Sequence, residues 1–208
     1  MSARLPEPVV LTGGRIRVEP LSRRHLADLF AAAGGDEEVW RWLPVATPRT
    51  VDELDAFLRA RIAEMERGER VVFAVVELAG GQAVGSTSFQ RFNLADESVE
   101  GGWTWYGRAA WRTGANLETK LLTLTHAFEE LGMNRVAWQT DHLNDRSRTS
   151  LLRLGARYEG THRADRKRAD GTFRDSDYFS MLRDEWPAAK EDLRARLGVA
   201  EGTAGGGL

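Results

Sequence analysis

The chain alternates between two spacings of apolar residues, one typical of strands and one typical of helices. Short alternating or β-branched runs predict strands at residues 15–19, 71–78, 83–92, 99–106, 135–140, 157–163 and 173–182. Apolar residues three and four positions apart predict helices at 23–33, 51–67, 117–131, 145–154 and 187–197. The order β-α-α-β-β-β-α-β-α-β-β predicts one α/β domain, in which an antiparallel meander meets strand–helix units.

Local signals support several of these boundaries. Thr50 and Glu53 form a capping box at the start of the second helix. Asn144 or Asp145 can cap the helix that follows the strand at 135–140. The Asp-Gly pair at 170–171 predicts a hairpin turn before the last strand.

Length and composition fit one soluble domain. The chain has 208 residues, of which 42% are hydrophobic and 29% are charged, enough to build a single core. We expect the domain to cover residues 1–198 and a flexible, Gly-rich tail to cover 199–208. No run approaches the roughly 18–20 apolar residues that span a membrane, and no amino-terminal apolar segment suggests export. We therefore expect a cytoplasmic protein without a membrane partner.

Charge and cysteine content exclude several classes of function. The net charge is −2 although arginine supplies 26 of the 29 basic residues, which argues against a nucleic-acid partner. The chain has no cysteine, which excludes disulfides, cysteine-ligated metals and a cysteine nucleophile. The histidines are isolated, so no metal site is expected.

One turn has the features of an anion site. Gly114 lies between an apolar strand and the start of a long amphipathic helix, where free backbone N–H groups and the helix dipole favour phosphate. Arg108 and Arg112 add positive charge nearby. The turn matches neither a Walker loop nor a dinucleotide fingerprint, and many such turns bind nothing.

An ordered series of motifs resembles the GNAT N-acetyltransferases, and within them the branch that includes the ribosomal-protein N-terminal (Rim-type) acetyltransferases. The matching stretches are Val99–Trp105, Trp111–Glu118, Thr125–Gly132, Thr140–Ser147, Leu154–Ala156 and Glu185–Trp186. The resemblance covers residues 15 to 187. It implies the GNAT fold, an α/β fold whose mixed, mostly antiparallel central sheet is splayed at the acetyl-CoA site and flanked by helices.

The chain departs from the family pattern in one loop. The family's acetyl-CoA loop is usually Gln/Arg-x-x-Gly-x-Gly/Ala, and alignment on Gly114 places Trp111 first and Asn116 last. Asn116 is bulkier than Gly or Ala where backbone approaches phosphate. Its amide could instead donate a hydrogen bond to a phosphate.

The resemblance implies that acetyl-CoA is the co-substrate and lies between the strands at 99–106 and 135–140. A β-bulge in the first strand, made easier by the glycines at 101–102, would free backbone groups for the pantetheine arm. A backbone N–H near Trp105 or Tyr106 would polarise the thioester carbonyl. The residues expected to contact the cofactor are Trp105, Tyr106, Arg112, Thr113, Gly114, Ala115, Asn116, Asn144, Ser147 and Arg148.

The resemblance also suggests catalytic groups. Glu100 is in place to act as the general base and Ser147 to protonate the leaving thiolate. Asp141 and Asp165 are alternative bases, and Tyr178 is an alternative acid. Glu100 could equally be an ion-pair partner, and Ser147 could simply lie in a capped first turn.

The acceptor side is expected to include Trp40, Trp42, Trp103 and His142. By the two-residue period of a strand, Trp103 and Trp105 should face opposite sides, so only one could face the ligand. Core packing is the alternative for each tryptophan.

These observations favour an N-acetyltransferase that moves an acetyl group directly from acetyl-CoA to a small-molecule or peptide amine. Without cysteine, no cysteine acyl-enzyme can form. The alternatives are a catalytically weak GNAT-like module or sensor that binds CoA, and an Arg-rich ribosome- or RNA-binding domain that the net charge disfavours. Relatives also make a homodimer a reasonable expectation.

Overall fold

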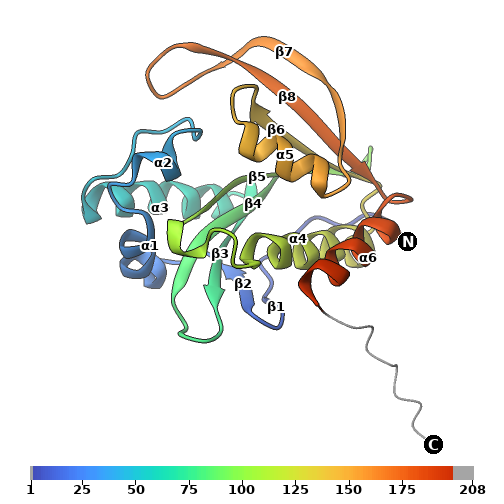
Figure 1. The fold of residues 1–208 in the computed structure, drawn as a ribbon, viewed down its shortest axis with the longest axis horizontal. Coiled ribbons are helices and arrows are strands. Elements are labelled where there is room, and N and C mark those ends of the chain that lie inside the picture. Colours follow the sequence, from blue (N-terminus) through green and yellow to red (C-terminus); the bar gives the residue numbers. More distant parts are fainter. Residues whose placement is uncertain (1, 199–208) are drawn as a thin grey trace, which may run out of the picture.

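One sheet of eight strands runs through the centre of the molecule in the computed structural model, which describes residues 2–198 (Figure 1). The tail expected at 199–208 lies outside the described residues. The sheet order is β1-β2-β3-β4-β5-β6-β8-β7. The strands are β1 (Leu11–Thr12), β2 (Ile16–Pro20), β3 (Arg70–Glu77), β4 (Ala83–Asn93), β5 (Ser98–Tyr106), β6 (Arg135–Asp141), β7 (Arg157–Lys167) and β8 (Phe173–Leu182). All neighbours are antiparallel except β5 and β6, which confirms the expected mixed, mostly antiparallel sheet.

Helices cover both faces of this sheet. They are α1 (Leu26–Ala33), α2 (Glu37–Trp40), α3 (Val51–Glu66), α4 (Ala115–Thr125), α5 (Asp145–Arg153) and α6 (Trp186–Leu197). A π-helical turn at His126–Glu130 continues α4. Alternate residues of β3 enter two separate cores: Val72 packs in the core with α1–α3, and Phe73 packs in the core with α4–α6. The face of the sheet therefore decides which helices a strand residue meets.

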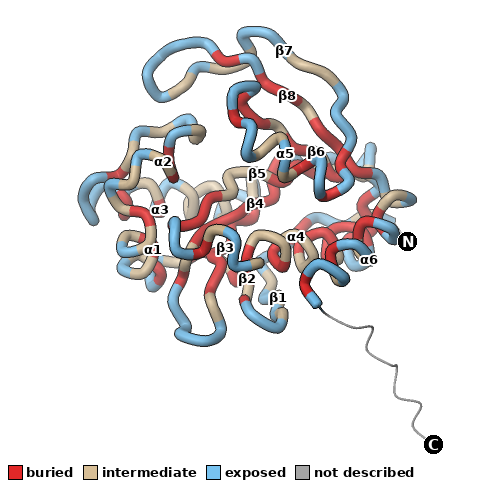
Figure 2. The backbone as a smooth tube through the Cα atoms, in the orientation of Figure 1, coloured by how far each residue is buried: buried red, intermediate tan, exposed pale blue. Residues whose placement is uncertain are grey.

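The predicted elements agree with the structure to within a few residues, with three differences. The two-residue strand β1 was not predicted, because it is too short to show an alternating pattern. The segment from Glu37 to Trp40 forms a short helix, α2, that is too brief to show a periodic pattern. The strand expected to end at Arg163 continues to Lys167, because β7 and β8 form one long hairpin with an irregularity at Ala164, whose φ is 50°. Much of the far end of this hairpin is exposed, while the centre of the sheet is buried (Figure 2).

The parallel strands β5 and β6 separate after a short paired stretch. They pair over Ser98–Glu100 and Arg135–Ala137 only, and β6 then stays paired with β8 along its whole length. Past Glu100, β5 contains a bulge: Ser86 and Ser88 of β4 pair with Trp105 and Gly102. The step from Gly102 to Trp105 covers three residues on β5, whereas the facing step from Ser88 to Ser86 covers two on β4. The additional residue bends β5. The expected splay and bulge are both present.

No helix among residues 2–198 has the length and apolar character needed to cross a membrane.

Candidate active site

The amino terminus of α4 forms a cradle of backbone N–H groups that have no acceptor within the helix. Gly114 precedes the helix with φ of 94°, a left-handed conformation that favours glycine. The helical hydrogen bonds begin with the Glu118 amide, which donates to the Gly114 carbonyl at 2.9 Å. The amides of residues 115–117 therefore lack helical acceptors. This end of α4 can bind an anion such as a phosphate.

Two arginines lie beside Trp111, in the loop that precedes the cradle. The Arg146 guanidinium lies 4.1 Å from the ring centroid of Trp111. The Arg108 guanidinium lies 5.7 Å from the same centroid and is paired with Asp36 at 2.6 and 2.8 Å. Arg112 is exposed in the loop, with φ of 63°. Arg146 comes from the first turn of α5, and the sequence analysis did not select it. The signal was its position between Asn144 and Ser147, inside a motif that was singled out for other residues.

A buried carboxylate holds this helix end in place. The two Glu118 carboxylate oxygens accept hydrogen bonds from the backbone amides of Gly14, Arg15 and Ile16, at 2.8, 2.9 and 2.9 Å. Gly13 has no room for a side chain, since a Cβ there would lie 2.6 Å from Glu118 Cδ. Glu118 thus ties the first turn of α4 to the start of β2, a role that the sequence alone did not reveal.

Glu100 lies where β5 and β6 begin to separate. Its carboxylate is buried and accepts hydrogen bonds from Gln90 at 2.5 Å, Gln139 at 2.9 Å and Arg91 at 3.2 Å. The donors belong to β4 and β6, so the side chain joins three strands. Both alternatives for Glu100 from the sequence, a reactive carboxylate and an ion-pair partner, are compatible with this position.

The bulge overturns the expected orientation of two tryptophans. Trp103, at φ 51°, occupies the bulge, and the additional residue shifts the alternation of the strand by one. Trp103 packs near Phe57 of α3, with ring centroids 6.2 Å apart, and Trp105 packs against Trp40 of α2 at 4.8 Å. Both side chains therefore face the helices α1–α3, and the expectation that they face opposite sides is wrong.

Trp40 is a core residue rather than a surface contact. It is 1% exposed, and its indole N–H donates to the Ala33 carbonyl at 2.8 Å. The expected direct contact between Trp40 and an acceptor is therefore not available in this structure. Trp42 is half-buried, and the Arg41 guanidinium lies 4.9 Å from the centroid of the Trp42 ring.

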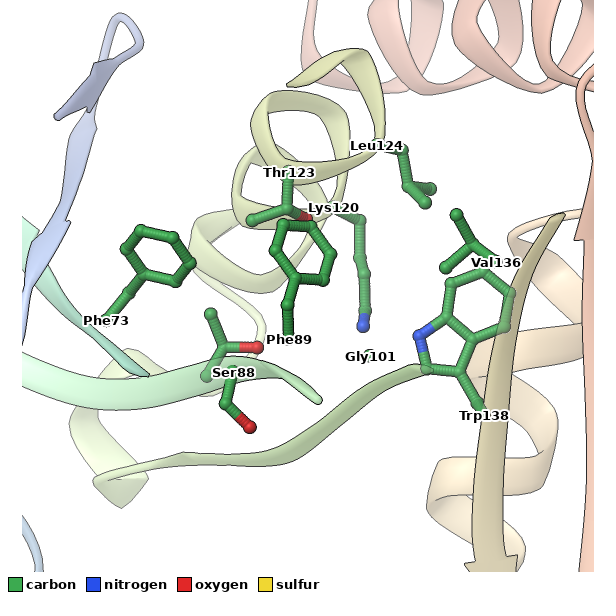
Figure 3. Close-up of a pocket in the computed structure, with 10 residues that line it drawn as sticks. Phe73, Ser88, Phe89, Gly101, Lys120, Thr123, Leu124, Val136 and Trp138 are labelled. Atoms are coloured by element: carbon green, nitrogen blue, oxygen red, sulfur yellow. The ribbon is translucent and has the colours of Figure 1, made fainter. Parts of the chain in front are cut away.

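A small pocket lies at the point where β5 and β6 part (Figure 3). Lys120 extends from α4 toward Gly101 and the Trp138 ring, with Nζ 5.4 Å from the ring centroid. A Cβ on Gly101 would lie 2.7 Å from Trp138 Nε1, so this close approach requires glycine. Burial lowers the pKa of Lys120 to about 8. Among residues 2–198, no carboxylate forms an ion pair with Lys120.

The start of α5 supplies another predicted group. Asn144 caps the helix, accepting the Ser147 amide at 3.1 Å, which confirms the capping interpretation. Ser147 is half-buried in the first turn. Asn116 of α4 reaches Ser150 of α5 at 3.4 Å, so the side chain that departs from the family loop links the two helices.

Arg148, expected to contact the cofactor, and His142, expected to contact the acceptor, both interact with the buried Asp177. Arg148 donates to Asp177 at 2.6 Å, and His142 Nδ1 lies 3.2 Å from the same carboxylate. Burial alone would raise the pKa of Asp177, but hydrogen bonds from Thr161, His142 and Arg148 hold it below its usual value. In this conformation the Arg148 guanidinium is paired with Asp177 and Asp145 and is not directed at the α4 cradle.

The remaining candidates have partners of their own. Asp141 receives two bonds from Arg168, at 2.6 and 3.1 Å, and Tyr178 donates to Asp165 at 3.3 Å. Burial alone would raise the pKa of Asp141, but the bonds from Arg168 hold it below its usual value. These two carboxylates are therefore less available as bases.

Trp105 and Tyr106 are buried, so any contact they make with a ligand would use their backbone. Thr113 lies in the loop beside Gly114, with its hydroxyl 3.3 Å from the Ala115 amide. Within residues 2–198, no group of three or more His, Asp or Glu side chains is arranged to hold a metal ion.

Comparison with known proteins agrees with this geometry. Residues 15–157 match the model of the acetyltransferase (GNAT) domain. A Bacillus subtilis (strain 168) protein described as "Putative ribosomal N-acetyltransferase YdaF" is 31% identical over 175 residues, which are 83% of this chain and 92% of that protein.

Two solved structures share the fold closely. A GCN5-related N-acetyltransferase from Brucella melitensis is 29% identical with a TM-score of 0.88, over 99% of this chain and 93% of that one. A structure titled as a putative acetyltransferase from T. thermophilus is 36% identical with a TM-score of 0.82, over 93% and 98% of the two chains. The chain is therefore an N-acetyltransferase that belongs to the GNAT family.

Proposed function

We propose that this enzyme uses acetyl-CoA to acetylate a primary amine, on a protein amino terminus or a small molecule. The observation that carries the proposal is the position of the α4 cradle beside the bulged, diverging strand β5. A phosphate site and a strand with freed backbone groups are what a long phosphorylated thioester needs in order to bind.

The residues present fit this co-substrate. Gly114 opens the cradle at a φ of 94°, a conformation that residues with a side chain rarely adopt. We assign the pyrophosphate to residues 112–116 together with Arg146, and the pantetheine arm to Asn144 and the backbone of residues 105–106. Arg148 would join the phosphate contacts only by leaving Asp177.

We assign the chemistry to groups around the separation of β5 and β6. Acetyl-CoA supplies an acetyl group activated as a thioester. A backbone N–H beyond the bulge would stabilise the developing oxyanion. Glu100 would take the proton of the attacking amine through a water molecule, and Ser147 would protonate the sulfur and recover its proton from solvent. The nitrogen–carbon bond forms as the carbon–sulfur bond breaks.

The acceptor must present a neutral amine, and an α-amine, with a pKa of about 8, does so more readily than a lysine side chain. The B. subtilis relative is described as a ribosomal N-acetyltransferase, and we place a protein amino terminus among the candidates on that basis. We also place the reaction in the cytoplasm, where acetyl-CoA and ribosomes occur together.

Release of free thiol from acetyl-CoA, measured over a panel of amines, tests this proposal. The expected result is thiol release that depends on the amine, with mass spectrometry showing one added acetyl group on the product. Tight CoA binding without turnover on any amine would favour a CoA-binding module instead. The absence of CoA binding would overturn the assignment of the α4 cradle.

A further inference from the structure

A second polar cleft lies between the segment after α2 and the β7–β8 hairpin. Figure 1 shows the hairpin arching across the sheet toward α2. The cleft is lined by Arg41, Trp42, Asp141, Lys167, Arg168 and Arg174, among others. It shares no lining residue with the pocket around Lys120.

Positive charge predominates in this cleft. Four of its lining residues are cations and one, Asp141, is an anion. Asp141 already accepts two bonds from Arg168, so that carboxylate and that guanidinium largely satisfy each other. Arg41 lies 3.7 Å from the Glu38 carboxylate, the longest ion pair of this region. The cleft therefore keeps an excess of positive charge facing its interior.

Arg174 is the feature that points to a ligand. It is only 8% exposed, and its Nε donates to Ser176 at 2.9 Å. Among residues 2–198, no carboxylate oxygen lies within ion-pair distance of its guanidinium, and its two terminal nitrogens have no protein acceptor. Burial, with Arg166 and Arg168 nearby, lowers the pKa of Arg174, and the carboxylates of Asp141 and Asp165, which lie beyond ion-pair distance, offset this only in part. A buried arginine is normally paired, and a guanidinium with two free nitrogens suits a carboxylate or phosphate.

The position of the cleft ties it to the acceptor side of the site. Asp141 is the last residue of β6, and β5 and β6, being parallel, separate toward their carboxyl ends. The cleft thus lies at the open end of that separation, next to Trp42. An amine that enters between the two strands from this side would carry the rest of its molecule in the cleft.

We propose that the acceptor carries an anionic group, a carboxylate or a phosphate, which Arg174 binds in this cleft with help from Arg41 and Lys167. The proposal rests on the proposed function, since it names the class of amine that the enzyme acetylates. Small anionic amines and peptides with acidic residues after the amino terminus share this chemistry. Polyamines and other polycationic amines are excluded by the same charge.

Matched acceptors test the proposal. Ethanolamine is compared with phosphoethanolamine, and a peptide beginning Ser-Asp-Glu with one beginning Ser-Lys-Arg. The anionic member of at least one pair should have a kcat/KM about 10-fold or more above its partner. The pair that shows the preference distinguishes a small acceptor from a peptide. Equal kcat/KM values in both pairs would overturn the proposal.

Arg174→Gln then locates the effect. It should raise the KM of the anionic acceptor by about 10- to 100-fold and leave the KM of acetyl-CoA and of the neutral acceptor unchanged. Arg163→Gln, an exposed arginine on the same hairpin, is the matched control. If Arg174→Gln does not fold, Lys167→Gln and Arg41→Gln should show a smaller change of the same kind. If Arg174→Gln lowers kcat/KM equally for the anionic and the neutral acceptor, Arg174 has a structural role only.

Direct binding separates this proposal from the proposed function. Calorimetry with the acidic peptide and with inorganic phosphate, each in the absence of acetyl-CoA, should detect binding to the wild-type protein and weaker binding to Arg174→Gln. If no amine is acetylated, the proposed function fails while this result still supports an anion site. If amines are acetylated but neither anion binds, the anion site is refuted and the proposed function stands.

Discussion

Lys120 shows what a single buried charge costs this fold. Its Nζ lies among apolar and hydroxyl side chains where β5 and β6 part, without a carboxylate partner in the described chain. Burial lowers its pKa from 10.5 to about 8. The unfolded state therefore binds this proton more tightly than the folded state, and stability should rise as the pH increases from about 8 toward 10.5.

Lys120→Met is expected to remove that cost. At pH 7 it should raise the free energy of unfolding by about 1–3 kcal/mol, and its advantage over the wild type should shrink between pH 8 and pH 10.5. Urea unfolding of both proteins at several pH values measures the difference. Lys167→Met, at an exposed lysine, is the control, and an equal response of the two variants would contradict the argument.

Glu100 provides a kinetic prediction at the same scale. Glu100→Gln keeps the size of the side chain but cannot accept a proton, so turnover should fall by about 10²- to 10⁴-fold while CoA affinity changes little. The pH dependence of kcat and the Kd of CoA are measured together. Glu97→Gln, in the turn between β4 and β5 and 38% exposed at its side chain, should behave as wild type. Full activity of Glu100→Gln across the pH range would leave Glu100 only its role of joining three strands.

The start of α4 is the element on which cofactor binding is expected to depend. Gly114→Glu would place a negative charge at the phosphate site and a side chain at a φ of 94°, so CoA affinity should fall by at least about 10-fold. Gly114→Asn is the matched variant, because asparagine tolerates the left-handed conformation and adds no charge. Calorimetric titration with CoA should find near-normal affinity for Gly114→Asn. Equal CoA affinities of the wild type and Gly114→Glu would refute the assignment of the phosphate site to this turn.

Elements were predictable from sequence where a local signal sets them. The capping box of Thr50 and Glu53 and the cap at Asn144 are present as expected, because each depends on contacts within one turn. The site was less predictable where contacts come from distant strands. The bulge at Trp103 was expected near the glycines at 101–102, but its effect on side-chain direction depends on the register with β4. Arg174 gave no local signal, since its lack of an ion-pair partner within residues 2–198 appears only when β8 packs.

At the scale of the molecule, Glu118 couples the cofactor site to the sheet. Its carboxylate accepts three backbone amides at the start of β2 while its helix presents the phosphate cradle. Glu118→Gln replaces one acceptor oxygen with a donor and removes the charge that strengthens these bonds. The free energy of unfolding should fall by about 2–4 kcal/mol, which lowers Tm by roughly 5–15 °C for a chain of this length.

Acetyl-CoA should partly compensate for this loss, since a ligand that binds only the folded state stabilises it. At a concentration 100 times its Kd, the gain is about 2.7 kcal/mol. Thermal unfolding of the wild type, Glu118→Gln and the exposed control Glu130→Gln, with and without acetyl-CoA, separates two effects of the substitution. If Glu118 only ties α4 to β2, acetyl-CoA adds the same stabilisation to every variant. If the tie also holds the 115–117 amides in position, the increment for Glu118→Gln is smaller at equal ligand concentration. We expect the smaller increment, because those amides belong to the turn that Glu118 anchors, and an unchanged Tm for Glu118→Gln would contradict both alternatives.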